Sequence, residues 1–329
     1  MDIHKVLSVI DGVRAEHVLI LCHHNADPDA VCSAYAFKGL LRRLRPKIQA
    51  DVRAPGLSRL SKALLESLSI DISVDQPRFE DVDVIVMVDT NTIKQLGPWG
   101  DKVTGSGAPL IFIDHHASHP ETEKLAEAYI SDEEASSTCE IVYGFYRELG
   151  LRPASDEAKA LFLGISFDTK HFILATSRTF RVAADLVEGG VDAQEALSLL
   201  ALPMDPSERI ARLKACQRLR LLRLGEWIVA LTHIGAYQAS AARALIDMGA
   251  HLTVVAGEKD GEVQVSLRSS REFYEKTGIH LGRDVAKPLG ERLRGMGGGH
   301  STSAGVNGFG TIEEALKEAE RVLKEKLVA

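Results

Sequence analysis

The stretch Leu110-Ile111-Phe112-Ile113-Asp114-His115-His116 decides the fold that this sequence predicts. Its four apolar residues, two of them β-branched, indicate a buried strand that ends in a carboxylate and two imidazoles. In an open α/β sheet, ligands bind just beyond the carboxyl ends of the strands. Because carboxylate and imidazole groups suit Mn²⁺, Zn²⁺ or Fe²⁺, Asp114, His115 and His116 are candidate metal-site residues. A polar loop with one His capping a helix is the alternative.

The first apolar run of the chain, residues 17–22, ends in a similar way. His23, Asp27 and Asp29 follow it in the turn before a helix that Pro28 opens, and a tight turn lets the three side chains converge. Helix capping by either Asp explains one carboxylate. Capping does not explain His23 together with both carboxylates, so all three are candidate metal ligands.

Asp89 and Asp168 complete the set of candidate ligands. Asp89 follows the continuous apolar run 83–88, which is typical of a parallel strand covered on both faces, although an Asx turn also explains it. Asp168 ends a predicted helix that starts near Ser155, where a carboxylate opposes the helix dipole and a bound cation would compensate for it. Three strand ends therefore carry Asp or His, which predicts a metal site at one edge of a sheet.

Length and composition bound the class of protein. The 329 residues predict two domains, each able to bury its own core, and the formal charge of −7 argues against broad attraction to nucleic acid. The four Cys residues have neither zinc-ribbon spacing nor the density of a disulfide scaffold, which favours a reducing compartment. The chain shows no signal-peptide pattern and no apolar run of roughly 20 residues. We expect a cytoplasmic protein with no membrane partner.

The pattern of elements predicts an α/β protein. Residues 1–190 are expected to form a metal-binding catalytic domain with a mainly parallel sheet flanked by helices. Residues 191–222 have the composition of a charged, helical connector, with prolines at 203 and 206 as breaks. Residues 223–329 are expected to form a smaller α/β domain with a mixed sheet.

The predicted second domain contains two candidate anion-binding features. The run Gly295-Met296-Gly297-Gly298-Gly299-His300 is expected to be a loop whose N–H groups approach an anion, with His300 as a donor. It is neither a P-loop nor a dinucleotide fingerprint, and a flexible turn is the alternative. Arg268 ends a predicted strand over residues 262–268, either as a solvated edge charge or as a fork for phosphate.

Taken in order along the chain, these motifs resemble those of the DHH phosphoesterases. The matching residues are His23-x-x-x-Asp27-x-Asp29, Asp89, Asp114-His115-His116 and Asp168, followed by Arg268 and Gly297-Gly298-Gly299-His300, which resemble the C-terminal DHHA1 domain. The compact length resembles the NrnA-type branch of nano-RNases, pAp phosphatases and cyclic dinucleotide phosphodiesterases. The resemblance implies a DHH domain and a DHHA1 domain, with the active site in the cleft between them.

The resemblance also implies roles for these residues around two Mn²⁺ ions, with Mg²⁺ as a possible substitute. The first metal would be held by His23, Asp27 and Asp89, and the second by Asp29, Asp89, His115 and Asp168. Asp114 would orient a ligand from outside the coordination shell. The substrate phosphate would be contacted by His116 and, from the second domain, by Arg268, Gly298, Gly299 and His300. The catalytic residues would be Asp89, Asp114 and His116.

The implied activity is a manganese-dependent phosphodiesterase or exonuclease that hydrolyses short RNA or DNA oligonucleotides, dinucleotides and pAp. A cyclic di-AMP or pApA phosphodiesterase is an alternative. A RecJ-like single-strand exonuclease is another, although the acidic balance argues against a long basic channel. An inorganic pyrophosphatase shares the N-terminal motifs but lacks the Gly-Gly-Gly-His motif. A nucleotide sensor, which would have lost metal ligands, is the alternative outside enzymes. The oligomeric state is left open, with a homodimer as one option.

Overall fold

The computed structural model describes residues 2–201, 204–259 and 261–327. It divides into two compact units, unit 1 at residues 1–202 and unit 2 at residues 203–329, each with its own sheet and its own hydrophobic core. A parallel sheet with helices comes first and a mixed sheet second, so the predicted α/β fold class is confirmed. Residue 1 of the first predicted domain, residues 202–203 of the predicted connector, and residues 260 and 328–329 of the second predicted domain lie outside the described residues.

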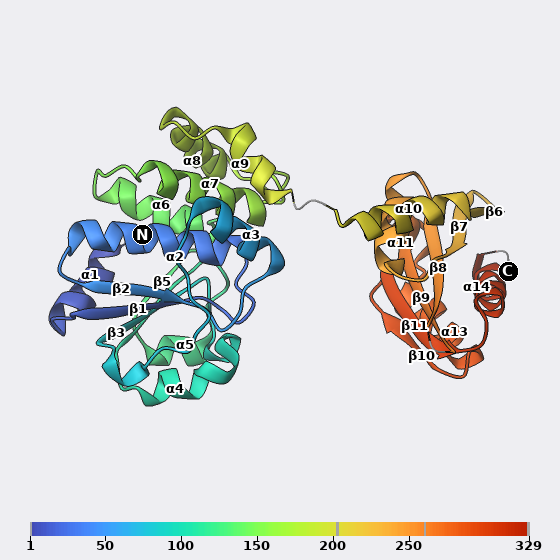
Figure 1. Ribbon diagram of the computed structural model, residues 1–329, viewed down its shortest axis with the longest axis horizontal. Helices are drawn as coiled ribbons and strands as arrows, with labels where there is room; N and C mark the ends of the chain where they lie inside the picture. The colour runs from blue at the N-terminus through green and yellow to red at the C-terminus, as the bar shows by residue number, and fades with distance from the viewer. Residues whose placement is uncertain (1, 202–203, 260, 328–329) are drawn as a thin grey trace. The chain divides into compact units, whose positions relative to one another are not determined.

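Unit 1 is built on a five-stranded parallel sheet in the order β2-β1-β3-β4-β5 (Figure 1). Its strands are β1 (His17–Leu21), β2 (Gln49–Arg53), β3 (Val84–Val88), β4 (Leu110–Asp114) and β5 (Ala126–Ser131). The adjacent strands β1, β3 and β4 are almost wholly buried because both faces of the sheet are covered. Because these three strands are parallel and adjacent, their carboxyl ends lie at the same edge of the sheet, where polar side chains follow each strand.

The helices of unit 1 form two layers around this sheet. They are α1 (Ile3–Gly12), α2 (Pro28–Leu44), α3 (Arg59–Leu68), α4 (Gly100–Gly105), α5 (Pro120–Leu125), α6 (Thr138–Glu148), α7 (Ser155–Asp168), α8 (Ser177–Glu188) and α9 (Ala193–Leu200), with 3₁₀ helices at Phe79–Asp81 and Ile93–Trp99. Figure 1 shows α2 and α6 on one side of the sheet and α4 on the other. Phe37 and Phe145 fill the first layer, while Trp99 and Phe112 fill the second.

Unit 2 is built on a six-stranded sheet in the order β10-β11-β9-β8-β7-β6, antiparallel except for the parallel pair β7 and β8. The strands are β6 (Arg220–Leu224), β7 (Trp227–His233), β8 (Leu252–Lys259), β9 (Glu262–Ser269), β10 (Met296–Gly299) and β11 (Ser303–Phe309). The helices are α10 (Pro206–Gln217), α11 (Gln238–Asp247), α12 (Arg271–Thr277), a π-helix at Leu281–Ala286, α13 (Lys287–Arg292) and α14 (Ile312–Leu327). Residues of α10 and α11 pack on one face of the sheet, and those of the π-helix, α13 and α14 on the other.

The predicted helical connector over residues 191–222 is corrected by the structure. It contains α9, which belongs to unit 1, and α10, which belongs to unit 2, but its last residues form the edge strand β6. The run Arg220-Leu221-Leu222-Arg223-Leu224 pairs with β7 along its whole length. A run of five leucine and arginine residues is too short to indicate whether it forms a helix or a strand. Here the hydrogen bonds to β7 determine that it is a strand.

The predicted glycine loop is also corrected, because residues 296–299 form strand β10 paired with β11. A Cβ atom at Gly297 would lie 1.8 Å from the carbonyl oxygen of Ala286 at the end of the π-helix. At Gly299, where φ is +142°, a Cβ atom would lie 2.5 Å from the carbonyl oxygen of Ser303. These two glycines therefore permit close backbone packing within unit 2. From composition alone, a glycine-rich strand of this kind cannot be distinguished from a flexible loop.

Candidate metal centre

The turn between β1 and α2 holds the first group of candidate ligands. Asp27 is the N-cap of α2, and its Oδ1 accepts hydrogen bonds from the N–H groups of Asp29 at 3.0 Å and Ala30 at 3.2 Å. Capping thus uses one oxygen of Asp27 and leaves the second for a cation. His23 Nε2 lies 3.9 Å from Asp89 Oδ2. His23, Asp27 and Asp89 offer ligand atoms within 4.8 Å of one another, a set that could hold one metal ion.

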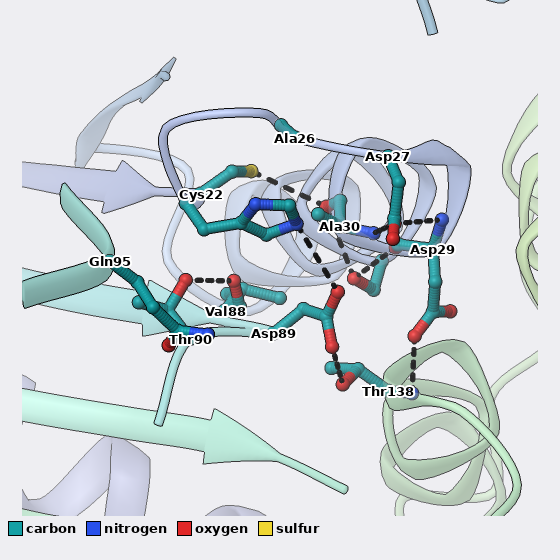
Figure 2. Close-up of polar contacts among 12 residues, drawn as sticks. Cys22, Ala26, Asp27, Asp29, Ala30, Val88, Asp89, Thr90, Gln95 and Thr138 are labelled. Atoms are coloured by element: carbon teal, nitrogen blue, oxygen red, sulfur yellow. Dashed lines mark hydrogen bonds and ion pairs between the residues drawn. The ribbon is translucent and has the colours of Figure 1, made fainter. Parts of the chain in front are cut away.

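Asp89 lies where β3 ends, between the two groups of candidate ligands. It is nearly fully buried, and its φ of +53° lies in the left-handed region, which Asp and Asn adopt more readily than most residues. Its Oδ1 accepts a hydrogen bond from the Thr138 hydroxyl at 3.0 Å (Figure 2). His115 Nε2 lies 3.6 Å from the same oxygen. Asp89 therefore faces His23 with one carboxylate oxygen and His115 with the other.

Asp29 is completely buried against the N-terminus of α6. Its Oδ2 accepts from the N–H of Thr138 at 2.7 Å and its Oδ1 from the N–H of Cys139 at 3.0 Å, and the first of these contacts is drawn in Figure 2. The helix dipole favours a negative charge at this position. A carboxylate oxygen has two lone pairs, so each retains one for a cation. Asp29, His115 and Asp168 form a further set of ligand atoms within 4.8 Å of one another.

Thr138 is a residue of this site that the sequence reasoning missed. Ser137 is the N-cap of α6, and its hydroxyl accepts from the N–H of Glu140 at 3.1 Å. Thr138 lies one residue later, and it donates its N–H to Asp29 and its hydroxyl to Asp89. The available signal was a threonine in the first turn of a helix, where free N–H groups attract anions.

The end of β4 places the Asp-His-His motif. Asp114 Oδ1 accepts from the backbone N–H of His116 at 2.8 Å and lies 2.7 Å from His116 Nδ1. Asp114 therefore orients the His116 ring, whereas the resemblance implied that it orients a metal ligand. His115 Nε2 lies 3.1 Å from Asp168 Oδ2, at the end of α7. This contact has the distance of an ion pair but not the geometry of a hydrogen bond, so within the described residues His115 Nε2, like Asp114 Oδ2, is buried without a hydrogen-bond partner.

The carboxylates of this cluster repel one another in a buried setting. Burial raises the pKa of Asp27, Asp29 and Asp89, and the negative charges of neighbouring carboxylates raise it further. Burial alone would lower the pKa of His115, but the carboxylates of Asp168 and Asp89 outweigh it and raise that pKa. Such crowding is unfavourable unless a cation compensates for it.

The donor set fits divalent metal ions. Carboxylate oxygens predominate, two imidazoles complete the sets, and a buried imidazole nitrogen is left without a hydrogen bond. The hydrogen bonds from α6 and from the α2 N-cap already direct the carboxylates before any ion binds. The structure thus brings together all six side chains predicted as metal ligands.

The four residues predicted to bind substrate from the second domain lie in unit 2. Arg268 on β9 is the register partner of Ser303 on β11, and the N–H of His300 donates to the Ser303 carbonyl oxygen at 2.7 Å. Arg268 and His300 therefore lie at the same end of the unit 2 sheet. Gly298 and Gly299 belong to β10, at the edge of that sheet. The cleft between the two domains stays a prediction.

Comparisons with known proteins agree with this division of the chain. The model for the DHH family, N-terminal domain, matches residues 17–165, and the DHHA1 domain model matches residues 232–326. The chain is 34% identical to an uncharacterized protein of Methanocaldococcus jannaschii over 325 aligned residues. The alignment covers 98% of this chain and 95% of that protein. It is 27% identical over 335 residues to a probable bifunctional oligoribonuclease and PAP phosphatase NrnA of Streptococcus mutans, spanning 96% of this chain and 98% of that protein.

Two further similarities are more limited. A probable manganese-dependent inorganic pyrophosphatase of Bacillus mycoides is 31% identical over 186 residues, which span 54% of this chain and 57% of that protein. The crystal structure of an exopolyphosphatase-related protein from Bacteroides fragilis has the same fold, with a TM-score of 0.61, 18% identity, and coverage of 99% of this chain and 96% of that chain. Among the described helices, none has the length and apolar character needed to cross a membrane.

Proposed function

The chain belongs to the DHH family of phosphoesterases, and from this premise we propose that it hydrolyses short oligonucleotides or dinucleotides to mononucleotides with two bound Mn²⁺ ions. The observation that carries the proposal is that two sets of mixed carboxylate and imidazole ligands lie side by side, since Asp89 of one set has its Oδ1 3.6 Å from Nε2 of His115 in the other. Both sets lie at the carboxyl edge of a parallel sheet, where α/β proteins bind their ligands.

In this proposal, His23, Asp27 and Asp89 hold one ion, and Asp29, Asp89, His115 and Asp168 hold the other. When bound, the pair of ions would supply a water of lowered pKa and positive charge opposite the phosphoryl oxygens. Mn²⁺ is proposed because ligand sets rich in carboxylate favour it over Zn²⁺, with Mg²⁺ as a substitute.

The protein groups around the ions have distinct tasks in this proposal. The half-exposed His116 ring is held through Nδ1 by Asp114, which leaves its Nε2 edge for a phosphate oxygen. Thr138 holds Asp29 and Asp89 in place from the N-terminus of α6. Such fixed hydrogen bonds reduce the reorganisation that the site must undergo during the reaction.

The substrate class rests on the relative that matches nearly the whole chain. The Streptococcus mutans relative carries the name of an oligoribonuclease and PAP phosphatase, and it spans both units. Arg268 and His300 are proposed to hold the far phosphate of such a substrate. The pyrophosphatase relative spans only 54% of this chain, so inorganic pyrophosphate is the weaker candidate.

An activity panel at fixed Mn²⁺ tests the proposal. Its substrates are pAp, pApA, cyclic di-AMP, pyrophosphate, and labelled RNA and DNA oligomers from two to about 24 nucleotides, a range that brackets a preference for short chains. We expect mononucleotides to be released fastest from the shortest oligomers, and EDTA to abolish the release. Dinucleotide binding without hydrolysis would indicate a sensor, and processive degradation of long strands would indicate a RecJ-like enzyme. Either result would overturn the proposal.

A further inference from the structure

One face of the unit 2 sheet carries polar residues beside its helices. On β9, Val263, Val265 and Leu267 are buried in the core, so Gln264, Ser266 and Arg268 point to the opposite face. Residues that are directly opposite on antiparallel strands share a face, which extends this surface to β11 and β10. We call it the open face, and its exposed or half-buried residues are Gln264, Ser266, Arg268, Met296, Gly298, Ser303, Gly305 and Asn307.

The open face has room for a ligand directly against the backbone. A Cβ atom at Gly298 would meet nothing within 4 Å, and one at its register partner Gly305 would meet only the Val265 carbonyl oxygen, at 3.9 Å. Gly297, in contrast, faces the other way and packs against the π-helix. Two adjacent strands therefore present bare backbone on the open face, a feature that permits close approach by a ligand.

Helix α11 brings a second guanidinium to the edge of this face. Thr253 on β8 is the register partner of Arg268. Its hydroxyl lies 3.2 Å from the carbonyl oxygen of Ala242 on α11 and 3.4 Å from that of Arg268. Arg243 is the next residue of α11 after Ala242, so its backbone lies one residue from this contact, and its side chain is exposed. Burial, followed by the positive charge of Arg243, lowers the pKa of Arg268, in keeping with this proximity.

Neither guanidinium forms an ion pair with a carboxylate in the described part of the chain. Arg268 donates from Nη1 to the carbonyl oxygen of its neighbour Leu267 at 2.9 Å. Other arginines of unit 2 do have such partners, as in the pairs Arg271–Glu275, Arg283–Asp284 and Arg292–Glu318. Two like charges side by side without a counterion repel each other, and an anion bound between them would remove that repulsion.

We propose that Arg243 and Arg268 together bind the terminal phosphate of the nucleotide on the open face, so that Arg243 determines specificity for phosphorylated ends. This inference rests on the proposed function, because it takes the substrate to be a nucleotide. A terminal phosphate monoester carries about −1.5 to −2 charges at pH 7, which two guanidiniums match better than one. The sugar and base then lie over Gly298 and Gly305, within reach of the side-chain amides of Gln264 and Asn307.

Equilibrium binding to the full-length protein in EDTA tests this inference without hydrolysis. The probes are AMP and adenosine, which differ only in the phosphate. We expect AMP to bind at least about tenfold more tightly than adenosine, because charge-assisted hydrogen bonds are involved. Arg243→Ala and Arg268→Ala should each reduce that preference by about tenfold. Arg271→Ala, which removes an arginine paired with Glu275, is the matched control and should leave it unchanged.

An unchanged preference for AMP in Arg243→Ala would overturn the inference, as would equal binding of AMP and adenosine to the unmodified protein. With substrate turnover as a second readout, Arg243→Ala should raise the KM for pApA by about tenfold while leaving the KM for ApA unchanged. The two proposals fail separately. If nucleotides bind with these preferences but none is hydrolysed, the proposed activity is lost and the phosphate site stands.

Discussion

Asp89 is the residue at which the two proposed metal positions meet, so a substitution there tests both. Asp89→Asn keeps the shape of the side chain and tolerates the φ of +53°, but it removes a charged ligand from each position. We expect kcat/KM to fall by more than the roughly 10- to 100-fold typical for loss of an outer-shell partner, with an unchanged circular dichroism spectrum. Near-normal turnover at saturating Mn²⁺ would contradict the role of Asp89.

The buried carboxylates also predict how stability depends on pH. Burial and neighbouring negative charges raise the folded-state pKa of Asp27, Asp29 and Asp89 above 3.8. A group with a raised pKa contributes stability that is complete below its unfolded pKa and is lost as the pH rises through its folded pKa. In EDTA, we therefore expect the contribution of this cluster to the free energy of unfolding to fall as the pH rises above 3.8 through the raised pKa values of the folded protein, while stabilisation by Mn²⁺ grows.

The measurement is urea unfolding at several pH values, with and without Mn²⁺. His115 and His116, whose pKa values are also raised, add to the same trend, while His23, whose pKa is lowered, opposes it. We therefore compare the unmodified protein with Asp29→Asn. In EDTA, the free energy of unfolding of the variant should fall less steeply as the pH rises. If the free energy of unfolding changes with pH equally in both proteins, then burial does not raise the pKa of Asp29 in the folded protein.

At the scale of the secondary-structure element, the first turn of α6 holds the carboxylates of the site. Thr138→Val removes only the hydroxyl bond to Asp89, because the N–H bond to Asp29 comes from the backbone. We expect Mn²⁺ affinity and kcat/KM to fall by about 10- to 100-fold, as is usual when an outer-shell partner is lost. Thr138→Ser, which keeps the hydroxyl, should restore both. If the valine variant binds Mn²⁺ normally, Thr138 has no positioning role.

Strand β10 offers two adjacent glycines with different tasks. Gly297→Ala would place a methyl group on the Ala286 carbonyl oxygen, so we expect it to lower the free energy of unfolding by about 1–3 kcal/mol. Gly298→Ala points to open space and should change that free energy by less than about 0.5 kcal/mol. Urea unfolding of the two variants tests this contrast. Equal destabilisation would mean that β10 packs differently.

The same elements show how far the sequence alone could predict the structure. The strands β1, β3 and β4 were predictable because both faces are buried, which leaves nearly continuous apolar runs. Parallel strands end at a common edge, so the convergence of the side chains that follow them was predictable too. β5, with the sequence Ala-Glu-Ala-Tyr-Ile-Ser, is a half-exposed edge strand and carries no such signal.

Other contacts depend on distances that only the folded chain sets. The hydroxyl bond from Thr138 to Asp89 joins residues 49 positions apart, and it depends on how α6 packs on the sheet. The neighbourhood of Arg243 and Arg268 follows from the register of β8 on β9 beneath α11, which the local sequence does not encode. The glycines of β10 and β11 weaken the apolar alternation that would have revealed these strands.

At the scale of the whole molecule, charge limits the substrates that the protein can hold. The formal net charge is −7, and the cationic groups assigned to the substrate are the two arginines of unit 2. Binding of a single strand weakens with salt in proportion to the number of phosphates contacted, by about 0.7 per phosphate on a double-logarithmic plot. Because both arginines are assigned to the same terminal phosphate, one contacted phosphate predicts a slope of about −0.7, far shallower than the slopes of proteins that follow a long strand through a basic channel.

The measurement is binding of labelled single strands of two to about 24 nucleotides to the full-length protein in EDTA, over a range of salt concentrations. If only the end of a strand is held, the salt slope should change little with length and the affinity should fall, since added nucleotides lie beyond the site and meet a protein of like charge. The turnover rate per molecule should then fall as strands lengthen, because each added phosphate is repelled without gaining a contact. A slope that steepens steadily with length would instead require a cationic path along the strand, and it would favour the single-strand exonuclease over an enzyme for short oligonucleotides.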